Sequence, residues 1–198
     1  TDGKIILELE DDAAYMNWGG NWRIPTMDEM NELSYQCTWT VINKNGVNGY
    51  KVTSKSNSNS IFIPFAGYYN GSLFTDVDVN GYYWSSVLQS NGHPNFAWRV
   101  CMKGFTTNTG HKCLGHSIRP VYGDLSSDDA GNVEHEYVDL GLSRLWATVN
   151  YGANSPTDVG TYLAWGEQKS KDLYTQDNYE FYVDEASLWE NVKAVLCQ

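Results

Sequence analysis

Apolar and polar residues alternate in several short runs in the first two-thirds of the chain, as expected of β-strands with one buried face. The runs are GYKVTSK (49–55), SIFIPFAGYY (60–69), GYYWSSV (81–87) and NFAWRVCM (95–102). Asn-Gly pairs punctuate this region, at positions 45–46, 48–49, 70–71, 80–81 and 91–92. Asn and Gly both tolerate the positive φ of a tight hairpin turn. The pattern therefore predicts a β-rich region built from hairpins.

A helical period replaces the alternation near both ends of the chain. Residues 9–18 carry acids in the first turn, and residues 27–37 follow Thr26, which forms a capping-box pattern with Glu29. The apolar stripe of the second predicted helix consists of Met30, Leu33 and Cys37. A third predicted helix begins after Asp184, with an apolar stripe of Leu188, Val192, Val195 and Leu196.

Composition narrows the classes of partner. The chain has 198 residues with 8 Trp and 14 Tyr, enough to bury a core, and a net charge of −11. Such an acidic surface repels phosphate groups, so we expect no nucleic-acid partner. We also expect no insertion into a membrane, because no apolar run approaches the length that spans a bilayer.

Residues 123–136 are polar and acidic and are predicted to form a linker. Apolar alternation resumes after it in YVDLGLSRLWATVNYG and GTYLAWGE. The chain is thus divided into a first portion, 1–122, and a second portion, 137–198.

Four motifs of the first portion occur in the order NWGGNWRIPTMDEMNEL, IFIPFAGYY, GYYWSSV and GHSIRPV. In this order they resemble the "major paralogous domain" family of secreted and surface proteins of gut Bacteroidetes. That family is similar to proteins with the C-type-lectin-like fold, in the branch that includes the formylglycine-generating enzymes. The resemblance implies an α+β, C-type-lectin-like fold, with two helices packed on twisted antiparallel β-sheets rich in hairpins. It also implies an extracellular, cell-surface or periplasmic location.

The second portion resembles the same family out of order. VDLGLSRLWATVNYGANSPTDVGTYLAWGE looks like the segment that begins such a domain, yet here it follows the C-terminal portion. Two arrangements follow. In the favoured one, residues 137–198 fold back and complete their own domain as a circular permutation. In the other, they complete a neighbouring copy in a domain-swapped homodimer.

The resemblance implies a ligand surface late in the domain, between Trp84 and Arg119, where related variable proteins carry their diversified segment. This interval is rich in polar and aromatic residues that suit recognition. The residues expected to contact a ligand are Tyr83, Gln89, Asn91, His93, Asn95, Arg99, Asn108 and His111.

Function is therefore predicted to be that of a non-catalytic recognition or adhesion module for a glycan or a protein. One alternative is a structural repeat of a surface array without a discrete ligand pocket. The last alternative, an oxidoreductase of the formylglycine-generating type, conflicts with the spacing of the cysteines. We do not expect an enzyme.

Calcium is the one cofactor that a pattern in the sequence indicates. Asp76, Asp78 and Asn80 match the start of a D-x-D-x-N-G loop. The twelfth position, however, is Val87, where the loop needs a bidentate Glu. An acidic hairpin explains the string more simply.

Cysteine placement predicts one disulfide. Strand alternation turns Cys101 and Cys113 to the same outward face of a hairpin, which favours a cross-strand bond. The partners of Cys37 and Cys197 are left open.

Overall fold

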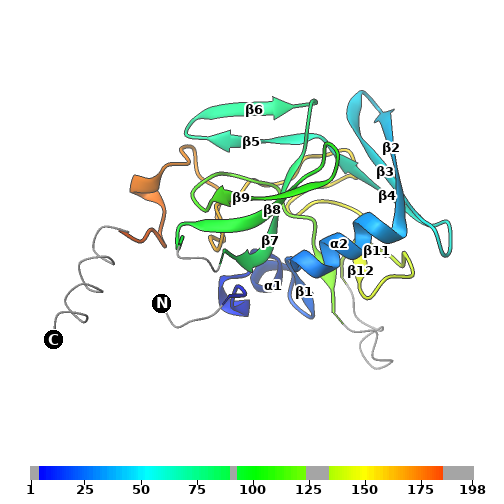
Figure 1. Ribbon diagram of the computed structural model, residues 1–198, viewed down its shortest axis with the longest axis horizontal. Coiled ribbons are helices and arrows are strands. Elements are labelled where there is room, and N and C mark those ends of the chain that lie inside the picture. The colour runs from blue at the N-terminus through cyan, green and yellow to red at the C-terminus, as the bar shows by residue number, and fades with distance from the viewer. Residues whose placement is uncertain (1–4, 90–92, 124–133, 185–198) are drawn as a thin grey trace.

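The computed structural model describes residues 5–89, 93–123 and 134–184, and Figure 1 shows their arrangement. Most of the regular structure in these ranges is antiparallel β-sheet, and two α-helices accompany it, so the fold is of the α+β type. No helix among the described residues is long and apolar enough to cross a membrane.

Helix α1 (Ala13–Trp18) begins at Asp12, after a short 3-10 turn, η1 (Leu9–Asp11). The Asp12 Oδ1 atom accepts the main-chain N–H groups of Ala14 at 2.9 Å and Tyr15 at 3.1 Å. The predicted helix over 9–18 is thus confirmed in its second half, with Asp12 as its N-cap.

Helix α2 (Met27–Gln36) confirms its predicted capping box. The Thr26 hydroxyl accepts from the Glu29 N–H, and the Glu29 carboxylate accepts from the Thr26 N–H. Met30 and Leu33 are fully buried, as the predicted stripe requires. The predicted C-terminal helix falls in 185–198, outside the described residues.

The strands form four antiparallel groups. The three groups of consecutive strands are β2 (Cys37–Lys44), β3 (Val47–Ser54) and β4 (Ser60–Pro64); β5 (Ala66–Asn70) and β6 (Leu73–Val77); and β7 (Tyr82–Leu88), β8 (Phe96–Cys101) and β9 (Thr106–His111). The fourth has the order β1 (Trp22–Arg23), β10 (Val121–Tyr122), β12 (Leu145–Ala147) and β11 (Tyr137–Val138).

Two Asn-Gly pairs have different roles. Asn45 and Gly46, with φ of 54° and 87°, turn the chain between β2 and β3 and confirm the predicted hairpin. Gly49, expected in another turn, lies inside β3 instead. A Cβ there would come within 2.4 Å of the Ile63 carbonyl oxygen, so this glycine permits close strand packing rather than a turn.

The second portion of the chain completes the sheets of the first. Strand β10 pairs with β12, bringing Val121 opposite Trp146. His116 and Leu163 exchange two main-chain hydrogen bonds of 3.0 Å, and Gly71 and Tyr174 exchange another pair. In this structure the two portions pair with each other, and the permuted arrangement stays a prediction. The swapped homodimer remains a prediction about the protein in solution.

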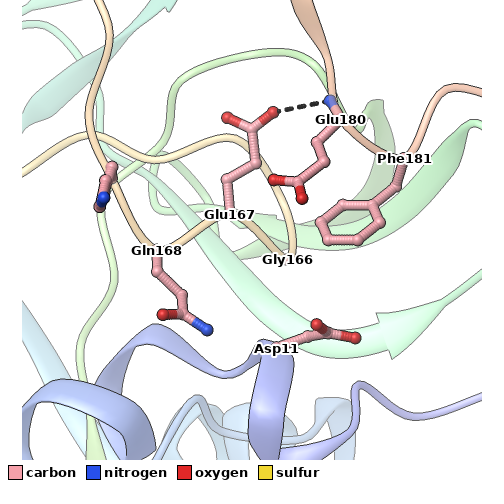
Figure 2. Close-up of a pocket in the computed structure, with 7 residues that line it drawn as sticks. Asp11, Gly166, Glu167, Gln168, Glu180 and Phe181 are labelled. Atoms are coloured by element: carbon pink, nitrogen blue, oxygen red, sulfur yellow. Dashed lines mark hydrogen bonds between the residues drawn. The ribbon is translucent and has the colours of Figure 1, made fainter.

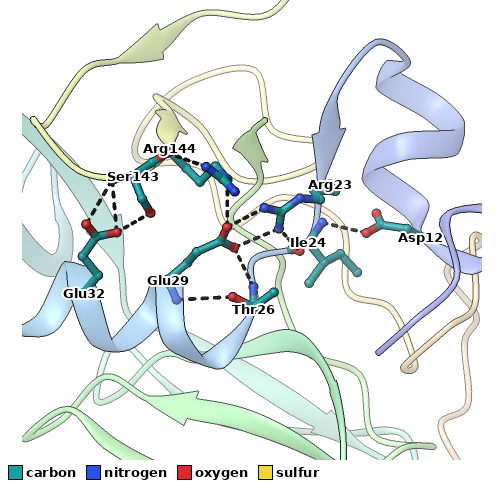
Figure 3. A network of polar contacts seen from close by, with 8 residues as sticks. All are labelled: Asp12, Arg23, Ile24, Thr26, Glu29, Glu32, Ser143 and Arg144. Atoms are coloured by element: carbon teal, nitrogen blue, oxygen red, sulfur yellow. Dashed lines mark hydrogen bonds and ion pairs between the residues drawn. The ribbon is translucent and has the colours of Figure 1, made fainter. Parts of the chain in front are cut away.

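A polar network ties the second portion to helix α2 (Figure 3). The Glu29 carboxylate lies between Arg23, to which it is hydrogen-bonded, and the Arg144 Nε atom at 3.0 Å. One turn further along, Glu32 accepts the main-chain N–H of Ser143. Burial, the largest single effect, would raise the pKa of Glu29, but its interactions with Arg23 and Thr26 together outweigh burial and lower that pKa.

Replacing Glu29 by glutamine is expected to lower the free energy of unfolding by about 1–3 kcal/mol, because both arginines lose their anionic partner. Urea unfolding measures the change. Asp28→Asn is the matched control, since Asp28 is exposed on the same helix turn, and it should cost less than about 1 kcal/mol. Equal losses for the two variants would contradict the assigned role of Glu29.

The predicted Cys101–Cys113 disulfide is wrong. In the β8–β9 register Cys101 pairs with Thr106 and Phe96 pairs with His111, so Cys113 lies beyond the opposite end of the hairpin. Cys101 accepts a hydrogen bond from the Asn80 side chain, and Cys113 is buried in the core. Both are free thiols, as is buried Cys37, while Cys197 lies outside the described residues.

Candidate functional site

Tyr83, expected to face a ligand, is fully buried. The alternation argument assumed that one face of its strand meets solvent, but β7 has β8 along one edge, a bridge from Tyr83 to Ser117 at the other, and packed side chains on both faces. The Tyr83 hydroxyl donates to the Pro64 carbonyl oxygen at 2.8 Å and accepts from Asn150 at 3.2 Å. Tyr83 therefore belongs to the core and not to a binding surface.

Asn95 also has a structural role. Its side chain is 4% exposed and exchanges two hydrogen bonds with the main chain of Val183, at 2.7 and 2.9 Å. These bonds hold the second portion against the start of β8, and they leave the amide unavailable to a ligand. The expectation that Asn95 contacts a ligand is therefore wrong.

The predicted histidines meet at one end of β8. His93 and His111 both contact the Phe96 ring, with ring centroids 5.9 and 4.0 Å away. Gln89 is half-buried nearby, and its main-chain N–H donates to the Phe96 carbonyl oxygen. Asn91, the remaining predicted residue of this loop, lies outside the described residues.

Arg99 and Asn108 lie on the other face of the same sheet. Arg99 is opposite Trp84 on β7 and Asn108 on β9, and residues paired across antiparallel strands share a face. Phe96 precedes Arg99 by three positions, an odd number, so its side chain points to the opposite face. The eight predicted residues therefore do not converge on one site.

Arg99 is held in place by groups that the sequence did not bring together. Its Nε atom donates to Asn108 Oδ1 at 2.9 Å, and its Nη1 atom donates to His116 Nε2 at 2.8 Å. Its Cζ atom lies 4.9 Å from the ring centroid of Tyr82 and 5.8 Å from that of Tyr68. We call Tyr68, Tyr82, Arg99, Asn108 and His116 the Arg99 site.

Gly110 on β9 makes room for the arginine. A Cβ at this position would come within 3.0 Å of the Cδ and Nε atoms of Arg99. The side chain can therefore lie flat over β9, with the rings of Tyr82 and Tyr68 beside it. Attraction between a guanidinium and an aromatic face adds about 0.5–2 kcal/mol per contact, depending on burial.

The charge of Arg99 is not neutralised by these contacts. Burial, followed by the charge of Arg99, holds the pKa of His116 well below its usual value, so this imidazole is neutral and accepts at Nε2. Burial and a hydrogen bond to Asp76 raise the pKa of Tyr82 to about 12, so its phenol keeps its proton and donates it at 2.8 Å. Burial also lowers the pKa of Arg99, but a guanidinium stays protonated near neutral pH. Within the described part of the chain, no carboxylate pairs with Arg99.

His116 gives the fold a measurable dependence on pH. Unfolded, it would titrate near 6.5, whereas the folded protein keeps it neutral to much lower pH. The unfolded state therefore binds more protons below pH 6.5, and stability falls as the pH decreases, by up to about 1.4 kcal/mol per pH unit.

We expect His116→Gln to unfold in urea with a shallower loss of stability below pH 6.5 than the wild type. Asp12 acts in the opposite sense, since burial raises its pKa to about 6 and it favours folding as the pH falls through that value. Both proteins contain Asp12, so the difference between their slopes isolates His116. Equal slopes would mean that His116 is already protonated in the folded state.

The calcium candidates do not form a calcium loop. Asn80 is 5% exposed, and its Oδ1 atom accepts the main-chain N–H groups of Gly81 and Lys103, both at 2.8 Å. The Asp76 carboxylate instead bonds the Tyr82 phenol. Asn80 therefore cannot offer its oxygen to an ion shared with Asp76 and Asp78. In the described ranges no three acidic, histidine or cysteine side chains gather around a metal position.

Recesses also occur where sequence reasoning placed no site, and two of them are built largely by the second portion. Figure 2 shows the first, a hollow of about 300 Å³ whose wall includes Asp11, Glu167, Glu180 and Phe181. The second, of about 400 Å³, is lined mainly by Tyr69, Tyr162, Tyr174 and Lys171. An ion pair of 2.7 Å between Lys171 and Glu167 connects their walls.

These recesses are built by the second portion, whose closely spaced aromatic residues between 162 and 182 were the available signal. Two of the three tyrosine hydroxyls that line the second recess already have partners. Tyr162 donates to the Ala66 carbonyl oxygen, and Tyr174 donates to the Tyr162 carbonyl oxygen at 2.6 Å. These two hydroxyls are therefore not available to a ligand.

Comparison with known proteins adds no relative. No family model, no curated protein and no solved structure matches this chain. The functional argument therefore rests on the geometry of the Arg99 site.

Proposed function

We propose that this chain is a non-catalytic recognition module that binds a glycan or a protein at the Arg99 site. The module would be a C-type-lectin-like domain of the "major paralogous domain" type, located outside the cell or in the periplasm. The α+β architecture with two helices and many hairpins supports this assignment. So does the way residues 137–184 complete the sheets of residues 5–122.

The observation that carries the proposal is the fixed position of Arg99. Its guanidinium is bonded on two sides and lies beside two rings, yet it has no carboxylate partner among the described residues. An arginine already held in one conformation loses little entropy when a ligand binds. Arg and Tyr are also the residue types that contribute most often to binding energy at recognition surfaces.

The surroundings of Arg99 suit binding rather than acid–base catalysis. A general acid or base works best with a pKa near the operating pH. Here burial drives the pKa of His116 far below neutrality, and that of Tyr82 rises to about 12. Neither group exchanges a proton readily near pH 7. The formylglycine-generating alternative also lacks its paired thiols, because Cys101 and Cys113 lie at opposite ends of a hairpin.

One observation favours the alternative of a structural repeat. The β5–β6 hairpin and the turn after it expose large apolar side chains, with Leu73 69% and Val79 56% exposed. The hairpin spans the top of the view in Figure 1. A neighbouring module of an array could bury these residues.

A glycan and protein array probed with wild type, Arg99→Met and Lys103→Met tests the proposal. Lys103 is an exposed cation just after β8, so its removal changes net charge equally without touching the site. Signals that disappear with Arg99→Met and remain with Lys103→Met are expected, with both variants folded by circular dichroism. Binding that survives Arg99→Met would place the ligand elsewhere.

A further inference from the structure

Three N–H donors of the Arg99 guanidinium have no partner among the described residues. A guanidinium has five N–H donors, one on Nε and two on each terminal nitrogen. The bonds to Asn108 and His116 use the Nε donor and one Nη1 donor. Three donors remain, all on Nη1 and Nη2, and none has a partner within the described chain. These two nitrogens are the pair that binds both oxygens of a carboxylate.

The electrostatics of the site favour an anionic group. Asn108 and His116 are neutral, so Arg99 retains its full charge. Its side chain is half-buried, where screening by water is weaker than at an exposed lysine. The remainder of the chain is acidic, with a net charge of −11, yet none of its described carboxylates pairs with this arginine.

The surrounding groups suit a sugar. The rings of Tyr68 and Tyr82 are half-buried beside the guanidinium, and aromatic rings pack well against the C–H faces of pyranoses. Asn108 is exposed, and its amide nitrogen has no partner in the described structure, so it can donate to a ring or hydroxyl oxygen. Asp76, held by Tyr82, lies beside the site and would accept a sugar hydroxyl.

Asp76 also restricts the orientation of a ligand. Its carboxylate repels a second anion, so a ligand carboxylate at Arg99 Nη1 and Nη2 would lie on the side away from Asp76. The site thus combines one cationic fork, two aromatic surfaces and separate donor and acceptor groups. A neutral sugar would leave the fork unpaired.

Resting on the function proposed above, we propose that the Arg99 site selects acidic sugars, binding the ligand carboxylate through Arg99 Nη1 and Nη2. The charge distinguishes an acidic sugar from its neutral form. The planar guanidinium can hold both oxygens of a carboxylate at once, whereas a lysine would offer only a single point charge.

The test is a titration, followed by ¹⁵N NMR, with galacturonate, glucuronate and N-acetylneuraminate glycosides, each beside its methyl ester. Esterification removes the charge and retains the ring and hydroxyl groups. At least one acid should shift the amides of β8 and β9 and bind about tenfold or more tightly than its ester. Arg99→Met should abolish this preference. Arg99→Lys, which retains the charge without the fork, should reduce it severalfold.

Each other outcome has a distinct meaning. If ester and acid bind equally and both depend on Arg99, the carboxylate inference is wrong, although the recognition site stands. The inference also fails if no acid binds, or if an acid binds Arg99→Met as it binds wild type. A sulfated sugar that binds more tightly than every carboxylate would overturn selectivity for carboxylates. The proposed function itself fails if, on the array, a ligand binds the Arg99→Met variant as well as it binds wild type.

Discussion

Replacing Trp84 by alanine is expected to lower the free energy of unfolding by about 3–5 kcal/mol. Trp84 is fully buried and packs within a cluster that includes Ile24, Ala97 and Ile118. Its indole N–H donates to the Leu163 carbonyl oxygen at 2.9 Å, which links β7 to the second portion of the chain. The alanine variant loses both the buried ring and this link.

Urea unfolding of three variants separates these contributions. Trp84→Phe retains most of the ring and loses the hydrogen bond, so it should cost less than the alanine variant. Tyr35→Ala removes an aromatic side chain that is 73% exposed on α2 and should change stability by less than about 0.5 kcal/mol. A loss below about 1 kcal/mol for Trp84→Ala would contradict the packing described here.

Replacing Arg119 by methionine is expected to cost about 3 kcal/mol or more. Arg119 is fully buried, and it donates to the carbonyl oxygens of Phe62 and Ala147 and to the Asn150 side chain, at 2.8–3.0 Å. These acceptors come from two distant segments, around Phe62 and around 147–150, and methionine would leave all three acceptors without this donor. Burial lowers the pKa of Arg119 to about 10, so the cation still predominates at neutral pH.

Arg119→Lys tests whether geometry or charge matters at this position. A single ammonium group cannot reach three acceptors arranged around a planar guanidinium, so it should recover only part of the loss. Lys51→Met, at an exposed position of β3, controls for the change in net charge. Full recovery of stability by lysine would show that the three acceptors do not depend on the guanidinium.

Local features were the ones most readily predicted from the sequence. The Thr26–Glu29 capping box and the Asn45-Gly46 turn each depend on residues that are neighbours in the chain, and both are confirmed. Gly49 shows the limit of such patterns, because the same Asn-Gly pair serves close packing against Phe62 and Ile63.

Features that depend on tertiary neighbours were predicted less well. Alternation along β7 could not reveal that both faces of the strand are covered, and so it placed Tyr83 outward. The cysteine prediction failed because the position of the β8–β9 turn, and therefore the register, is not encoded in alternation alone. Arg99 and Asn108, both expected to contact a ligand, are neighbours across the β8–β9 hairpin.

The other members of the Arg99 site come from distant parts of the chain. Tyr68 is on β5, and His116 is held by its main-chain bonds to Leu163 in the second portion. No local spacing connects these residues with Arg99. Only the main-chain position of His116 depends on pairing with the second portion.

The central claim is that residues 134–184 close onto their own chain, where Leu163 pairs with the main chain of His116 in the Arg99 site. Light scattering during size-exclusion chromatography tests this claim most directly. The account predicts a particle of 22.3 kDa, the mass of one chain, at every protein concentration. A particle of twice that mass that persists on dilution would contradict it and would favour the swapped homodimer.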